Sequence, residues 1–191
     1  MLYTQILATI IKNSNKMTTF PVVASTLSET ELGRFITEKY QLNEDSNCKL
    51  FRTGVNHTYF ILDNESKFVV RVYCYKWRTK IEIEQELELL ILLKNNSLSV
   101  SYPIADKNGN LIQEINAPEG LRYVVVFSYA KGEKMRYMSN ETCYSIGSLM
   151  AKIHNLTETR KLDRVNYDSE ILLNKEYNFL KSYLHIFYIY A

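Results

Sequence analysis

The chain has 191 residues, of which 46% are hydrophobic and 23% charged, a composition typical of a globular protein with one core, or with one small domain and part of another. Its formal net charge of +2 gives no indication of a nucleic-acid-binding surface. The three cysteines, Cys48, Cys74 and Cys143, lack the short paired spacings of a zinc site or a disulfide framework. We therefore expect a cytoplasmic protein with no nucleic-acid partner.

An apolar run opens the chain at residues 2–11. No basic residue precedes it, Lys12 and Lys16 follow it, and it is only about half as long as a membrane span. We interpret residues 1–19 as an N-terminal extension, either an extra helix or a stretch upstream of an alternative start at Met17. No membrane partner is expected.

Residues 28–40 are predicted to form the first helix of the folded part. Ser28 and Glu31 have the spacing of a capping box, and Leu32 and Ile36 fall on one helical face. Three runs rich in aromatic and β-branched residues come next, separated by turn-forming residues; they cover residues 49–52, 58–62 and 67–73. They predict an antiparallel meander.

The segment 77–94 fits two patterns. Residues 81–84 alternate as in a strand, whereas Ile83, Leu87 and Leu90 follow a helical period. Its length, and the absence of Gly and Pro, favour a helix.

The second half of the chain begins with strand signals and ends with helical ones. Asn108 and Gly109 form a strong hairpin signal between residues 104–106 and 110–115, and the consecutive apolar residues of 121–128 predict a strand buried on both faces. Beyond these strands, an amphipathic helix is expected at 139–156. A further helix, capped by Ser169, is expected after it.

Residues 50–59 resemble the phosphate-covering loop of the aminoglycoside phosphotransferase, choline kinase and homoserine kinase family. That family uses a Gly-x-Asn turn, here Gly54 to Asn56, where protein kinases have three glycines. The resemblance implies that Gly54 lets the backbone approach a phosphate and that amides of the turn donate to its oxygens. Taken alone, the motif also fits a simple hairpin.

Residues 68–73 resemble the strand that presents a Lys to the nucleotide phosphates in kinases. Arg71 stands at that position, and a guanidinium can bridge two phosphate oxygens. The implied partner on the long helix is Glu86, with Glu84 and Glu88 as alternatives. Without the resemblance, Arg71 reads as a strand-edge cation and the glutamates as a solvated helix face.

Residues 124–132 are similar to the hinge between the two lobes of a kinase. The resemblance implies that Phe127 backs the nucleotide pocket. It also implies that the main chain of Ser128, Tyr129 and Ala130 hydrogen-bonds the base.

Residues 146–154 resemble the first large-lobe helix of the same family, with His154 as a structural residue near the helix end. The motifs occur in the family's order and imply an α+β fold, a protein-kinase-like small lobe with an antiparallel sheet and one long helix, followed by the first helices of a large lobe. The expected divisions are an extension at 1–19, the small lobe at 20–128, a hinge at 129–138 and the start of a truncated large lobe at 139–191.

The catalytic strings of the family, His-Gly-Asp-x-His-x-x-Asn and Asp-x-Asp, do not occur in the sequence. The nearest candidates, Asp163 with Asn166 and then Asp168, are assigned to a loop and an N-cap. The resemblance thus implies the N-terminal portion of a phosphotransferase that uses ATP or GTP with Mg²⁺ on a small-molecule hydroxyl, inactive as this chain. A natural fragment, a truncated gene product and a frameshifted product all fit this expectation.

Two other functions stay open at this point. A non-catalytic kinase-like module would bind a nucleotide or a partner without phosphoryl transfer, and an unrelated α+β protein would carry these motifs by coincidence. The DNA downstream distinguishes the phosphotransferase fragment from the non-catalytic module. If the parent protein is an enzyme, that DNA should encode the missing catalytic motifs in some reading frame. The acceptor is equally open among aminoglycosides, choline, homoserine and other alcohols.

Overall fold

The computed structural model describes residues 21–132, 135–161 and 168–189. The chain divides into two compact units, Met1–Arg78 with Ser101–Lys131 and Thr79–Val100 with Gly132–Ala191. None of the described helices is long and apolar enough to cross a membrane. The first unit contains every strand described here, and the second contains helices.

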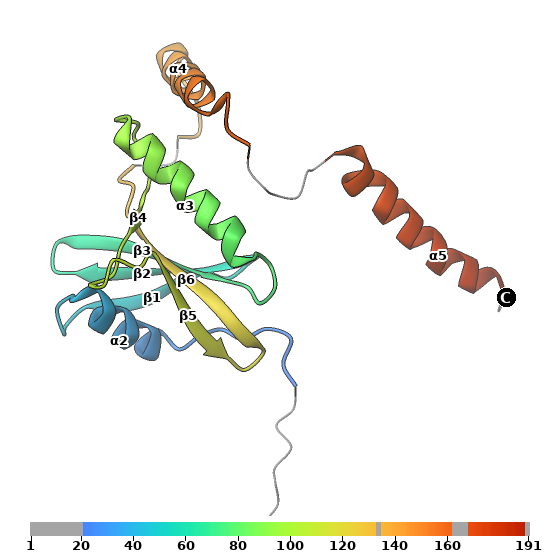
Figure 1. Ribbon diagram of the computed structural model, residues 1–191, viewed down its shortest axis with the longest axis horizontal. Helices are drawn as coiled ribbons and strands as arrows, with labels where there is room; N and C mark the ends of the chain where they lie inside the picture. Colours follow the sequence, from blue (N-terminus) through green and yellow to red (C-terminus); the bar gives the residue numbers. More distant parts are fainter. Residues whose placement is uncertain (1–20, 133–134, 162–167, 190–191) are drawn as a thin grey trace, which may run out of the picture. The chain divides into compact units, whose positions relative to one another are not determined.

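The first unit is built on a six-stranded antiparallel sheet (Figure 1). Its strands are β1 Asn47–Arg52, β2 Asn56–Asp63, β3 Ser66–Tyr73, β4 Pro103–Ile104, β5 Ile112–Ala117 and β6 Gly120–Ser128. The spatial order is β1-β2-β3-β6-β4, and β5 also pairs with β6. The predicted meander and the α+β class are confirmed.

Helix α2, Glu29–Tyr40, lies against one face of this sheet (Figure 1). Its predicted N-cap is confirmed, because the Ser28 hydroxyl accepts a hydrogen bond from the amide of Glu31 at 3.4 Å. The Glu31 carboxylate, however, pairs with Arg34. Only one half of the expected capping box therefore forms.

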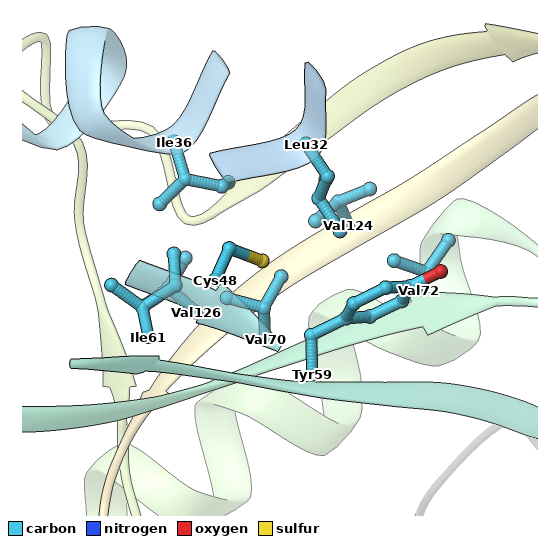
Figure 2. Packing of buried hydrophobic residues seen from close by; sticks show 9 residues of the cluster. All are labelled: Leu32, Ile36, Cys48, Tyr59, Ile61, Val70, Val72, Val124 and Val126. Atoms are coloured by element: carbon cyan, nitrogen blue, oxygen red, sulfur yellow. The ribbon is translucent and has the colours of Figure 1, made fainter. Parts of the chain in front are cut away.

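Every second residue on the strands points toward α2 and forms the core with it (Figure 2), as the two-residue period of a strand requires. The buried cluster comprises Leu32, Ile36, Cys48, Tyr59, Ile61, Val70, Val72, Val124 and Val126. The helix approaches β1 closely at Gly33, where an added Cβ would lie 2.8 Å from the Cβ of Cys48. This core fixes which side chains of β2, β3 and β6 point to the opposite face.

The chain turns at Asn108 and Gly109, but the predicted hairpin between the flanking strands is wrong. Strands β4 and β5 each pair with β6. Only Gly109 of the pair has a positive φ, 85°, whereas a type I′ hairpin turn requires positive φ at both central residues. The Asp106 carboxylate stabilises the turn instead, accepting from the amides of Asn108 at 2.9 Å and Asn110 at 2.8 Å.

Strand β6 is buried along most of its length, which confirms the expectation from its consecutive apolar residues. Val124, Val125, Val126 and Phe127 are all buried. Arg122 is buried as well, with only 1% of its surface exposed. The sequence pattern did not anticipate a buried cation in this strand.

In the second unit, helix α3 covers Lys80–Asn95, so the choice of helix over strand is confirmed. Its start was not foreseen. Thr79 forms a complete capping box with Glu82, accepting from the Glu82 amide at 3.2 Å while the Thr79 amide donates to the Glu82 carboxylate at 2.8 Å.

The predicted helix near residue 139 is also confirmed. Helix α4 runs over Asn140–Thr157, with Ser139 as its N-cap accepting from the amide of Thr142 at 3.2 Å.

A π-helical segment, η1 Glu170–Asn174, leads into helix α5, Lys175–Ile189. The predicted cap by Ser169 is wrong, since its side chain makes no capping hydrogen bond. The neighbouring Asp168 carboxylate accepts from the Ile171 amide at 3.0 Å instead. Asp163 and Asn166 lie outside the described residues.

Candidate functional site

The predicted phosphate-binding cation lies on the sheet face opposite α2. Val70 and Val72 belong to the core under α2, so alternation places Arg71 on the other face of β3. Across the sheet, Arg71 pairs in register with Thr58 of β2 and Val125 of β6. Since β3 lies between these two strands, Arg71 occupies a central position in the sheet.

The Arg71 guanidinium lies close to two aromatic side chains. Its central carbon lies 4.8 Å from the centroid of the Phe127 ring, within the range of a cation–π interaction. Its Nη1 lies 3.4 Å from the hydroxyl of Tyr73, two residues along the same strand. The structure therefore brings together Arg71 and Phe127, two residues that the sequence assigned to one site.

The Gly54 turn lies at the end of the sheet where β3 finishes. Asn56, the first residue of β2, pairs in register with Tyr73, the last residue of β3, and the thiol of Cys74 donates to the carbonyl of Gly54 at 3.5 Å. A Cβ at Gly54 would meet its nearest atoms at 3.9 Å, an ordinary contact. Protein packing therefore does not demand glycine here, and the predicted close approach of a phosphate stays a prediction.

Two polar atoms at the start of β2 are buried without a hydrogen-bond partner among the described residues, Asn56 Oδ1 and His57 Nδ1. Such atoms are uncommon, because leaving a buried polar group unpaired costs free energy. Asn56 was predicted to belong to the site, whereas His57 faces the core side with Tyr59. The strand that leaves the Gly54 turn thus carries unused hydrogen-bonding capacity.

Ser128, the first of the predicted base-contacting residues, is already engaged by other protein groups. Its amide donates to the carbonyl of Tyr102 at 2.9 Å, and its carbonyl accepts from the Ser101 hydroxyl at 2.6 Å. Its hydroxyl accepts from the Tyr102 amide at 3.0 Å. These bonds anchor the end of β6, after which Tyr129 and Ala130 follow.

A second cation–aromatic cluster lies on the Arg71 face and was not foreseen. The ammonium of Lys67 lies 3.9 Å from the ring centroid of Phe60 and 4.2 Å from that of Tyr129. Phe60 also stacks against Phe51, with centroids 4.5 Å apart. The sequence contained the necessary clue, because Lys67 and Arg71 are four residues apart on one strand and therefore share a face.

The buried Arg122 forms a polar cluster on the α2 side that sequence reasoning also missed. Its Nε donates to the Tyr73 carbonyl at 2.9 Å, and its Nη1 donates to the Ser25 carbonyl at 2.8 Å and to the Glu119 carboxylate at 3.3 Å. Burial, and then the charge of Arg122, lower the pKa of His57. The cluster fastens the backbone of Tyr73, whose hydroxyl contacts Arg71 on the other face.

Glu86, the predicted partner of Arg71, lies on α3 in the second unit, and its pairing with Arg71 stays a prediction. Within the part of the chain that the structure describes, no group of three His, Cys, Asp or Glu side chains could hold a metal ion.

The family assignment follows from comparison with known proteins. The family model described as the phosphotransferase enzyme family (APH) matches residues 47–177, which include the sheet, α3 and α4. The chain belongs to this family. The predicted recognition is confirmed.

Two relatives are themselves uncharacterised. A protein of Synechocystis sp. is 29% identical over 143 residues, covering 74% of this chain and 40% of the relative. A protein of Deinococcus radiodurans is 32% identical over 116 residues, covering 61% of this chain and 34% of the relative. The chain therefore spans well under half the length of these two proteins.

Solved kinases share the fold. A microcompartment-associated aminopropanol kinase matches with a TM-score of 0.63 and 20% identity, over 76% of this chain and 47% of that one. An amicoumacin kinase in complex with AMP-PNP and Ca²⁺ matches with a TM-score of 0.60 and 15% identity, over 83% and 54%. A spectinomycin phosphotransferase in complex with ADP and spectinomycin has a TM-score of 0.56 and 11% identity, over 76% and 44%. These matches establish the kinase-like fold.

Proposed function

We propose that this chain forms the nucleotide-binding side of a phosphotransferase that acts on a small-molecule hydroxyl. The observation that carries the proposal is the position of Arg71, held over the Phe127 ring on the central strand. The Gly54 turn lies at the same end of the sheet. A guanidinium and main-chain amides in a turn are groups that bind a chain of phosphates.

Each residue has a distinct role in this proposal. Arg71 bridges phosphate oxygens, amides of the turn from Gly54 to Asn56 donate to the same phosphates, and Phe127 forms the apolar backing. Glu86 orients Arg71. Because both main-chain groups of Ser128 are engaged, the base is hydrogen-bonded mainly by the main chain of Tyr129 and Ala130.

The nucleotide is ATP or GTP, carried with Mg²⁺. The amicoumacin kinase was solved with AMP-PNP and Ca²⁺ and the spectinomycin phosphotransferase with ADP, which supports a nucleotide ligand for this fold. The described residues of this chain do not fit a metal site of their own, so no metal-dependent step is assigned to them. The three cysteines form no disulfide with one another, and we propose a cytoplasmic location.

A non-catalytic nucleotide-binding module is the second candidate. It requires no group beyond the nucleotide site described above, and so it fits the position of Arg71 over Phe127 equally well. Both candidates require the same nucleotide site. They differ in whether a catalytic loop accompanies it.

Alkylation of Cys74 tests the nucleotide site directly. Its thiol lies 3.5 Å from the Gly54 carbonyl, so phosphates bound at the turn should shield it from iodoacetamide. Exposed Cys143 on α4 provides an internal control, and Cys48 should stay unmodified because burial raises its pKa to about 11.

We expect ATP with Mg²⁺ to slow the modification of Cys74, followed by mass spectrometry, and to leave Cys143 unchanged. Arg71→Ala should abolish the protection. Glu86→Gln should weaken it, whereas Glu84→Gln and Glu88→Gln should not. A Cys74 rate that millimolar ATP or GTP leaves unchanged would exclude the proposed site.

A further inference from the structure

Lys67, Phe60 and Tyr129 form a closed triad in which each side chain contacts the other two. The Lys67 ammonium lies over both rings, at 3.9 Å from the Phe60 centroid and 4.2 Å from the Tyr129 centroid. The two rings meet edge to face, with centroids 5.8 Å apart and planes at 88°. Because the residues come from β3, from β2 and from the segment after β6, the triad joins three separate parts of the sheet.

The triad restrains the residue that follows the anchored end of β6. Ser128 is bound through its amide, carbonyl and hydroxyl to residues 101 and 102. Tyr129 is next in the chain, and its ring is held from the side by Lys67 and Phe60. The bonds of Ser128 and the ring contacts of Tyr129 thus both restrain the chain at Tyr129.

The triad also lies on the same sheet face as the proposed phosphate-binding group. Lys67 precedes Arg71 by four residues on β3, which is about 13 Å along the strand at about 3.3 Å per residue. One end of this face therefore carries Arg71 over Phe127, and the other carries Lys67 between Phe60 and Tyr129. With its phosphates at Arg71 and its base at the main chain of Tyr129, as proposed above, a nucleotide would run along this face toward the triad.

We propose that Lys67 is a positioning residue for nucleotide binding, holding Tyr129 so that its main chain is already arranged for the base. The inference rests on the proposed nucleotide site. A segment ordered in advance loses less conformational freedom on binding, and the affinity rises accordingly. Lys67 itself does not touch the phosphates in this account, in contrast to Arg71.

The nature of the triad predicts which substitutions preserve it. Ring faces attract a cation, and an exposed cation–π contact is weak but measurable. Lys67→Met keeps the length of the side chain and removes the charge, so ATP binding should weaken by about threefold to tenfold. Lys67→Arg keeps a cation over both rings and should restore binding to within about twofold of the wild type.

The matched control is Lys39→Met. Lys39 also lies over a ring, 5.8 Å from the centroid of Phe35, but both residues belong to α2 on the other side of the sheet. This variant should bind ATP as the wild type does. Thermal unfolding of all three variants shows whether any loss of affinity merely follows a loss of stability.

The experiment compares two ligands, ATP and inorganic tripolyphosphate, by titration calorimetry. Lys67→Met should lose affinity for ATP alone, whereas Arg71→Ala should lose affinity for both, because of these two side chains only that of Arg71 binds phosphates. Equal affinities of Lys67→Met and wild type for ATP would overturn the inference and leave the nucleotide site intact. A parallel loss for tripolyphosphate would overturn it too, since Lys67 would then act as a phosphate-binding charge. Wild-type protein that binds neither ligand would overturn the proposed function and this inference with it.

Discussion

Arg122 and Arg71 lie on opposite faces of one sheet, and their guanidinium groups have different surroundings. Arg122 is buried among carbonyls and the Glu119 carboxylate, so its charge is compensated inside the protein and serves the fold. Arg71 lies over the rings of Phe127 and Tyr73 on the other face. Strand alternation places the two side chains on opposite faces. Arg122 is two residues from Val124 on β6 and therefore lies on the α2 side, whereas Arg71 lies between the core residues Val70 and Val72 of β3 and points to the other side.

His57 should make stability depend on pH. Burial and the neighbouring Arg122 lower its pKa in the folded state, and Glu119 opposes them. The unfolded chain binds the proton more readily, with a pKa of about 6.5, so stability present at pH 7 is lost as the pH falls below that value. Urea unfolding between pH 7 and 5 should show a steeper loss for wild type than for His57→Gln. Parallel curves would mean that His57 is not buried in the neutral form.

At the scale of elements, the close packing of α2 on β1 depends on Gly33. An added methyl group would lie 2.8 Å from the Cβ of Cys48, so Gly33→Ala should destabilise the protein by about 1–3 kcal/mol through overpacking.

Gly54→Ala is the control for that variant, because its Cβ would meet nothing closer than 3.9 Å. It should leave the free energy of unfolding nearly unchanged. Chemical denaturation measures both variants, and equal stabilities for the two would show that α2 does not approach β1 as closely as described.

Most elements were predictable because their determinants are local. The apolar residues of α3 recur with a helical period, and turn-forming residues separate β1, β2 and β3. Both signals lie within short stretches of the sequence. The predictions that were wrong concern features that depend on contacts between distant residues or on local backbone geometry. Strands β4 and β5 pair with β6 rather than with each other. Asp168 and Ser169 are neighbours of residue types that both cap helices well, and the backbone geometry determines which of the two side chains accepts the capping hydrogen bond.

For the candidate site, the sequence predicted which side chains lie together only where a motif marks them. Arg71 and Phe127 were named from family resemblance and lie together. Lys67 and Arg122 belong to no motif, and their partners Tyr129 and Ser25 are distant in sequence. Their contacts follow from strand register, which a single sequence does not specify without the pairing partners.

At the scale of the whole molecule, the 191-residue chain should show no acceptor-dependent transfer. Phosphoryl transfer requires a positioned base and bound metal, and the sequence lacks the family strings that supply them. A coupled ADP-release assay over aminoglycosides, choline and homoserine checks this. Acceptor-dependent release above that of Arg71→Ala would show that catalytic groups are present in the chain after all.

The central claim is that the Arg71 face binds a nucleotide through its phosphates. Calorimetric titration of the wild-type chain with ATP and Mg²⁺ tests it most directly. We predict a dissociation constant in the high-micromolar range or weaker, roughly −5 kcal/mol or less favourable, with binding lost in Arg71→Ala and retained in Arg34→Ala, whose side chain is exposed on α2. Equal binding by wild type and Arg71→Ala, or no heat from either ATP or GTP at millimolar concentration, would contradict the claim.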